Sequence, residues 1–307
     1  MEIKKLDEDK CKNLKDLFIE WHERHEEDVN ELRIEVNKLK EREYSCPSPR
    51  KLTKLLKEFG IPGCFSEWFI KDVDMGNVPK AENWEYVLKN AFNLDGGKKN
   101  FEPEPGDYQN IFLFKEANDS DKISSNSKDS YPCFASELEK GNVNPWIYDW
   151  PEKKFRSGIP CKLPKAFEKY CEITISEKPG GFLDHAGYMN INKRGGESRA
   201  DEKAILNYAK YYRNYILREI ELLGGSQEQI KIFVCGSKDY FRKLMKNLGL
   251  KLNDTEKDDK AKYCFINITH PSAAISYENL VKQMKLEQFD PKLKKEEPVY
   301  VSKFEYQ

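Results

Sequence analysis

The chain has 307 residues, of which 38% are hydrophobic and 34% are charged, and its formal net charge is −1. A chain of this length buries a substantial core, in one large domain or two modest ones. The near-zero net charge excludes a global field that attracts nucleic acid, so an anionic partner requires a local basic patch.

The eight cysteines are scattered, and no two of them form a Cys-x-x-Cys pair. This spacing is typical of free thiols in a reducing compartment and argues against a zinc or iron–sulfur site, although distant cysteines can still converge. The first residues, MEIKKLDEDK, lack the apolar core of a signal peptide, and no apolar run is long enough to span a bilayer. We therefore expect a cytoplasmic protein with no membrane partner, no metal and no cofactor.

Residues 8–43 are predicted to form one long, highly charged helix with a single apolar stripe. The stripe residues recur at steps of three and four: Leu14, Phe18, Trp21, His25, Val29, Leu32, Val36 and Leu39. The stripe fits a helix packed on the rest of the protein or a coiled-coil seam for a protein partner. Trp21 and His25 are awkward in a tight seam, which favours the packed helix. His22 and His25 are expected to be ordinary, partly exposed side chains.

Ser48 and Pro49 can begin the next helix, which Gly60 ends. Two shorter helices follow, and the stretch GGKKNFEPEPGD has the composition of a linker. The predicted division is an all-helical N-terminal region of unknown role (1–105), an α/β domain (106–290) and a C-terminal tail (291–307).

Beyond residue 105 the pattern changes to alternating strands and helices. Strands are predicted over 110–117, 187–192, 230–236 and 263–269, and helices over 201–225, 238–249 and 276–286. This alternation predicts a parallel sheet with right-handed crossovers. Each strand ends in polar residues, in KEAND, NINKRGG, CGSKD and THPS, and ligands bind at the carboxyl ends of such strands. That convergence is the first indication of a functional site.

Residues 119–185 are predicted to contain long loops, which in a compact domain are usually functional or mobile. The basic stretch 152–162 follows Trp146, Tyr148 and Trp150. Cations bind phosphates and aromatic rings stack on exposed bases, so the stretch suggests contact with DNA. A solvated loop is the alternative.

The order of the four strand ends resembles the uracil-DNA glycosylase superfamily over residues 108–285. His270, Pro271 and Ser272 follow the last predicted strand and match the His-Pro-Ser motif of that family. The resemblance implies a three-layer α/β/α fold with a central four-stranded parallel sheet. The segment FLFKEAND stands where the family has Gly-x-(Asn/Asp/Ala)-Pro but lacks that glycine and proline. The first hundred residues have no counterpart in the family.

The resemblance implies a monofunctional DNA glycosylase that acts in DNA repair. Such an enzyme flips uracil or another altered base out of DNA and hydrolyses its N-glycosidic bond with water, without a cofactor. The alternative is a catalytically silent member that binds nucleic acid or a protein, which the missing glycine and proline suggest. A nucleotide enzyme of another kind is a third interpretation, but the chain has no Gly-x-Gly-x-x-Gly or Walker sequence.

Cleavage of a base–sugar bond creates an oxocarbenium-like sugar and an anionic base. In this resemblance His270 donates a hydrogen bond to the base oxygen, as an oxyanion hole does. Asn118, Glu116 or Asp119 holds the attacking water on the opposite side, and a carboxylate offsets the positive charge on the sugar. Each residue also has a purely structural alternative. His270 can be the last residue of a strand, Asn118 can belong to a turn, and Glu116 can pair with a lysine.

Base recognition is expected from amide and aromatic side chains. The amide of Asn190 or Asn192 would read the base edge, with at most one of the two facing the pocket. Tyr131 or Phe134 would stack on the flipped base, unless both belong to the core.

Phosphate binding is expected from backbone amides at helix N-termini and from cationic side chains. The candidates are the amides of Ser272, Ala273 and Ser237 and the side chains of Lys193 and Arg194. Ser272 is also expected to be an N-cap. A solvated loop is the alternative for the two basic residues.

Overall fold

A computed structural model of the protein describes most of the helical region and nearly all of the sheet. The described residues are 2–43, 47–62, 65, 88–92, 94–95, 108–118, 134–139, 141, 159–176, 180–196, 200–251, 261–285 and 297–306. Of residues 43, 116–118, 159–161 and 196 the backbone alone is described.

The centre of the fold is a five-stranded sheet in the order β2-β1-β3-β4-β5. Its strands are β1 (Asn110–Asn118), β2 (Gly187–Gly196), β3 (Ile230–Cys235), β4 (Tyr263–Ile268) and β5 (Val299–Val301). The first four are parallel, which confirms the predicted parallel sheet, and β5 is antiparallel to β4. The expected count of four strands was therefore too low. The C-terminal segment expected to be a tail supplies the fifth strand.

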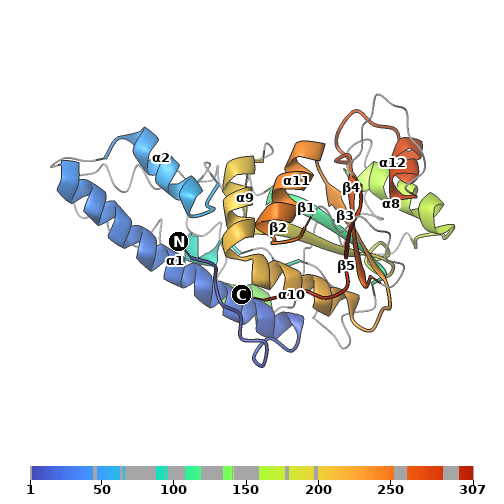
Figure 1. Ribbon diagram of the computed structural model, residues 1–307, viewed down its shortest axis with the longest axis horizontal. Helices are drawn as coiled ribbons and strands as arrows, with labels where there is room; N and C mark the ends of the chain where they lie inside the picture. Colours follow the sequence, from blue (N-terminus) through green and yellow to red (C-terminus); the bar gives the residue numbers. More distant parts are fainter. Residues whose placement is uncertain are drawn as a thin grey trace.

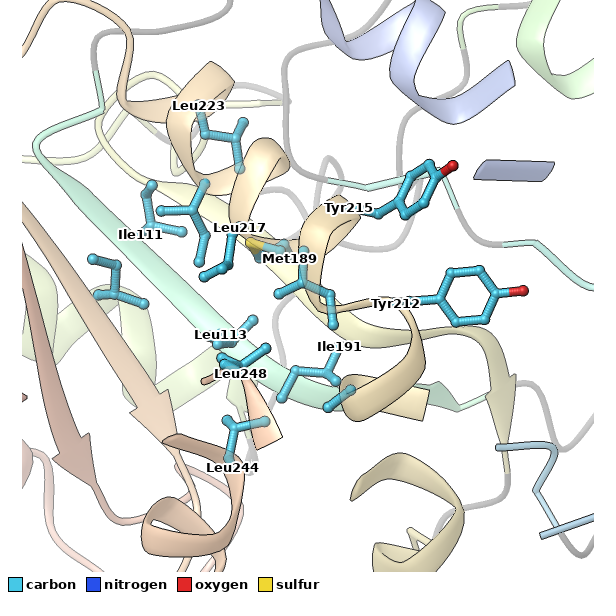
Figure 2. Packing of buried hydrophobic residues seen from close by; sticks show 14 of the residues in the cluster. Ile111, Leu113, Met189, Ile191, Tyr212, Tyr215, Leu217, Leu223, Leu244 and Leu248 are labelled. Atoms are coloured by element: carbon cyan, nitrogen blue, oxygen red, sulfur yellow. The ribbon is translucent and has the colours of Figure 1, made fainter. Parts of the chain in front are cut away.

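Helices cover both faces of the sheet, as Figure 1 shows. One face is covered by α9 (Glu202–Tyr211), α10 (Arg213–Gly224) and α11 (Lys238–Asn247), and the other by α8 (Ile159–Cys171) and α12 (Tyr277–Met284). Side chains of a strand alternate between faces. Ile111 and Leu113 accordingly lie in the cluster under α9–α11 (Figure 2), and Phe112 and Phe114 lie under α8 and α12. This arrangement confirms three α/β/α layers.

The N-terminal helix α1 (Leu14–Glu43) packs on the α/β part of the protein. It begins after Asn13, whose side-chain oxygen accepts a hydrogen bond from the backbone N–H of Asp16 (2.9 Å). Trp21 is fully buried and its ring lies 5.5 Å from that of Tyr215 in α10. The prediction of a packed helix is confirmed. His25 differs from its expected partial exposure, because it is fully buried and bonded to the Tyr208 hydroxyl (2.7 Å).

The second helix, α2 (Pro49–Glu58), matches the predicted start and end. Its buried residues Leu52 and Leu56 form a third, smaller cluster with the C-terminal half of α1. After α2 the chain turns through Gly60, whose φ of +69° suits glycine. A Cβ at Gly60 would lie 2.8 Å from the Cα atom of Tyr208, so α2 is held tightly against α9.

The boundary expected near residue 105 does not separate two cores. Leu14, Phe18 and Trp21 belong to the same buried cluster as Ile111 and Met189 of the sheet. The N-terminal region and the α/β layers therefore share one large core, and the smaller cluster under α2 extends from it.

Two helical predictions differ from the structure. The single helix predicted over 201–225 is divided into α9 and α10 at Tyr212 (φ −100°, ψ 19°), whose hydroxyl donates to Asp28 in α1 (2.6 Å). Helix α8 lies in the segment expected to be loops, and it contains Pro164. Its buried residues Leu163 and Phe167 are spaced four apart, as on one helical face.

Candidate functional site

His270 lies at the carboxyl end of the sheet, two residues after β4. Its ring meets that of Phe114 in β1 edge to face, with centroids 5.4 Å apart and planes at 89°. Phe114 in turn stacks on Tyr188 of β2 at 4.5 Å. Aromatic contacts across three strands therefore fix the histidine at the edge where a parallel sheet binds ligands.

Ser272 determines which nitrogen of the His270 ring carries the proton. The backbone N–H of Ser272 donates to His270 Nδ1 (3.3 Å), and the Ser272 hydroxyl lies 2.6 Å from the same atom. A backbone N–H can only donate, so Nδ1 is the acceptor. The proton of the neutral ring is then on Nε2, which is the donor of the imidazole.

The His270 ring is held in its neutral form. Burial, and next the positive charge of Lys115, lower the pKa of His270 from 6.5 to about 4. Lys115 lies in the C-terminal half of β1, and its Nζ pairs with Glu202 (3.0 Å) and stands 4.3 Å above the centre of the Tyr240 ring. At neutral pH, His270 therefore offers an uncharged N–H donor beside a lysine.

Backbone N–H groups of the turn after His270 are hydrogen-bonded within the turn itself. The Ala273 N–H donates to the His270 carbonyl oxygen (2.9 Å), and the Ala273 carbonyl accepts from Lys162 Nζ (2.6 Å). The expected binding of phosphate by the Ala273 amide is therefore corrected, because that amide closes the turn. Ser272 is not an N-cap either, since Ser276 caps α12 by accepting from Asn279 N–H. Ser237 is exposed and caps α11.

The amides of Asn190 and Asn192 are bonded to the N-terminal region. The backbone N–H and side-chain amide of Asn190 both donate to one carboxylate oxygen of Asp95 (2.8 Å each). The amide of Asn192 donates to the Gly60 carbonyl oxygen (3.1 Å). Residues two apart in a strand share a face, and both of these are fully buried against the N-terminal region. The expectation that one of them reads a base is corrected.

Lys193 and Arg194 also lie inside the protein and not on a DNA-facing surface. Lys193 Nζ contacts both Asp95 and Glu219, the latter at 2.7 Å, and Arg194 Nη2 lies 2.6 Å from Asp28 Oδ2. All five side chains are fully buried. The expected phosphate contacts are corrected, because these cations join the N-terminal region to β2 and α10.

The two buried carboxylates around Lys193 are expected to make the unfolding free energy depend on pH. Burial raises the pKa of Glu219 well above 4.5, and the neighbouring Asp95 charge raises it further, against the lowering effect of Lys193. The folded protein then binds a proton that the unfolded chain releases near pH 4.5, so its unfolding free energy falls as the pH rises above that value. Glu219→Gln is expected to flatten this fall, measured as the difference between urea unfolding free energies at pH 5 and pH 8. If the unfolding free energies of variant and wild type differed by the same amount at pH 5 and at pH 8, Glu219 would not be protonated in the folded protein.

The remaining predicted site residues are only partly placed. Phe134, in α6 (Phe134–Glu139), is buried and stacks on His22 at 4.0 Å, so it belongs to the core and the base-stacking expectation for it is corrected. The backbone of Glu116 pairs with Asn192 and that of Asn118 with Gly196, and their side chains lie outside the described part. Tyr131 lies outside the described residues altogether.

Sequence reasoning missed two lysines beside His270. Lys162 in α8 donates to the Ala273 carbonyl oxygen of the turn, and the charge of Lys115 in β1 lowers the pKa of His270. Lys115 stands at a strand end, which is a usable signal. Lys162 is brought to the turn only by the packing of α8 against α12, which the sequence pattern did not reveal.

Among the described residues, no group of three or more His, Cys, Asp and Glu side chains could hold a metal ion. No helix within those same ranges is long and apolar enough to cross a membrane. The described cysteines Cys11, Cys171, Cys235 and Cys264 are free thiols, and burial raises the pKa of Cys235 well above its ordinary value.

Comparisons with family models, curated proteins and solved structures find no match to this chain. The interpretation of the site therefore depends on its geometry.

Proposed function

We propose that the protein is a DNA glycosylase that hydrolyses the N-glycosidic bond of uracil or another altered base. One observation carries the proposal: a neutral histidine, with its proton on Nε2, is fixed at the carboxyl end of a parallel sheet. This is the chemistry that the resemblance to the uracil-DNA glycosylase superfamily requires of the residue after the last parallel strand.

The proposed mechanism uses His270 as an electrostatic catalyst. When the base leaves with the bonding electrons, negative charge develops on its carbonyl oxygen, and the Nε2–H of His270 donates to that oxygen. A neutral imidazole suits this role because it keeps its proton in the donor position throughout. Lys115, which lowers the pKa of His270, adds positive charge beside the anionic base. Glu116 or Asn118, from the end of β1, would position the water that attacks the sugar.

The test is a set of duplex and single-stranded oligonucleotides that contain uracil, hypoxanthine or a modified pyrimidine. We expect at least one of them to yield alkali-sensitive abasic sites with the wild-type protein. Matched oligonucleotides with normal bases are the control. Folded protein that produces no abasic site on any substrate would overturn the proposal.

A second candidate is a catalytically silent protein that binds nucleic acid or another protein. It is favoured by the burial of Asn190, Asn192, Lys193 and Arg194, which leaves these four side chains inside the protein. The two candidates differ in the effect of His270→Ala. The substitution strongly slows excision in the first case and leaves binding unchanged in the second.

A further inference from the structure

Positive charge is concentrated in one part of the N-terminal region. Residues 33–58 contain eight Lys and Arg and four Glu, whereas residues 2–31 contain six Lys and Arg and eleven Asp and Glu. The whole chain has a net charge of only −1, so this segregation is local. The basic segment comprises the C-terminal part of α1 and all of α2, which lie together at one extremity of the molecule in Figure 1.

The basic residues of α2 lie on its outer face. Leu52 and Leu56 point into the cluster with α1, and Arg50, Lys51 and Lys54 are exposed. Arg50 and Lys54 are four residues apart and therefore adjacent on the helix surface. The Lys54 side chain is 70% exposed and stands 3.7 Å from Glu58, a surface pair that neutralises it only weakly.

Two ion pairs link the outer face of α2 to α9 and, through α9, to β1. Lys57, in the last turn of α2, pairs with Asp201 at the start of α9 (3.0 Å). The next residue, Glu202, pairs with Lys115 in the C-terminal half of β1 (3.0 Å). Lys115 is the residue whose charge lowers the pKa of His270. The cations of α2 are therefore connected to the His270 edge through the first turn of α9.

The end of α2 is held firmly in place. The amide of Asn207 in α9 donates to the Lys57 carbonyl oxygen (2.8 Å), and that of Asn192 in β2 donates to the Gly60 carbonyl oxygen (3.1 Å). Together with the close contact between Gly60 and Tyr208, these bonds fix the direction in which α2 leaves the sheet. A fixed row of cations suits a partner whose negative charges are regularly spaced.

We propose that the outer face of α2, formed by Arg50, Lys51 and Lys54, binds the phosphate backbone of the duplex DNA whose altered base is held at His270. This inference rests on the proposed function and gives a role to the N-terminal region. Phosphate contacts of this kind do not depend on base sequence, and they release counterions. In this proposal α2 increases the affinity for DNA, and His270 stabilises the departing base.

The test is the affinity of the full-length protein for an undamaged, fluorescein-labelled duplex, measured by anisotropy over a range of salt concentrations. Arg50→Ala/Lys54→Ala is expected to weaken binding at least about tenfold near 0.1 M salt and to make the plot of log affinity against log salt shallower by about 1.8, about 0.9 for each contact removed. Lys10→Ala/Lys12→Ala is the matched control, because both lysines are exposed and precede α1. It is expected to bind like wild type.

The result separates this inference from the proposed function. Unchanged affinity and salt dependence in Arg50→Ala/Lys54→Ala, or an equal loss in the control pair, would overturn the role of α2. The duplex contains no damaged base, so the assay reports on α2 whether or not any base is excised.

Discussion

Replacing His270 with alanine is expected to lower the single-turnover rate of base excision by ~10²–10³, the usual effect of removing one donor from an oxyanion-type site. The Nε2–H of His270 is the group proposed to stabilise the departing base, and alanine has no donor to replace it. The measurement is the rate of abasic-site formation at saturating protein on whichever damaged oligonucleotide is cleaved. Binding to that oligonucleotide is expected to change much less than the rate.

His185→Ala is the matched control for this variant. His185 is exposed and lies just before β2, at the opposite end of the sheet from His270. Its loss is expected to leave the excision rate at the wild-type value. Equal rates for His270→Ala and wild type would refute the proposed donor. In the wild-type protein the proposed excision rate is expected not to fall between pH 7 and pH 5.5 through protonation of His270, because its pKa is about 4.

Asp28→Asn is expected to destabilise the whole protein by about 3–5 kcal/mol, the usual cost of leaving a buried charge without its partner. Asp28 is fully buried, accepts hydrogen bonds from Arg194 (2.6 Å) and Tyr212 (2.6 Å), and forms an ion pair with Lys4 (2.9 Å). The asparagine keeps the size of the side chain but removes the charge that Arg194 and Lys4 require. The measurement is the free energy of unfolding from urea titration.

Glu27→Gln is the control for that substitution. Glu27 is the preceding residue of α1 and its side chain is 48% exposed, so its replacement is expected to change the unfolding free energy by no more than about 0.5 kcal/mol. Since the N-terminal region shares its core with the sheet, Asp28→Asn is also expected to keep a single unfolding transition. If Asp28→Asn were as stable as Glu27→Gln, the Asp28–Arg194 pair would not be what holds α1 to β2.

Most of the sheet could be predicted because its parallel strands contain short apolar stretches, such as IFLF in β1 and YCFI in β4. β3 and β4 were predicted to within one residue of their observed ends, since a strand buried on both faces has few polar positions. The helix α8 was missed because its prolines indicate loops. β5 was missed because three residues are too few for a pattern to be visible.

The candidate site was predicted less well, and the reason is long-range packing. His270 could be placed because the strand before it and the proline after it are adjacent in sequence. The environment of Lys193 and Arg194 could not be predicted, because their partners Asp95 and Asp28 are 98 and 166 residues away in the sequence. A Lys-Arg pair after a strand usually faces water or phosphate. Here acidic residues of the N-terminal region neutralise it inside the protein.

The short strand β5 has a consequence for how the protein is made. All six residues of β4 are buried, and β5 covers the outer edge of β4 through the pairs Tyr263–Val301, Cys264–Tyr300 and Phe265–Val299. During synthesis, β4 leaves the ribosome more than thirty residues before β5 does. Until then its edge is an open template for another chain. Chaperone binding is therefore expected to matter most in that interval, and a nascent chain stalled before Val299 is the form most prone to aggregate.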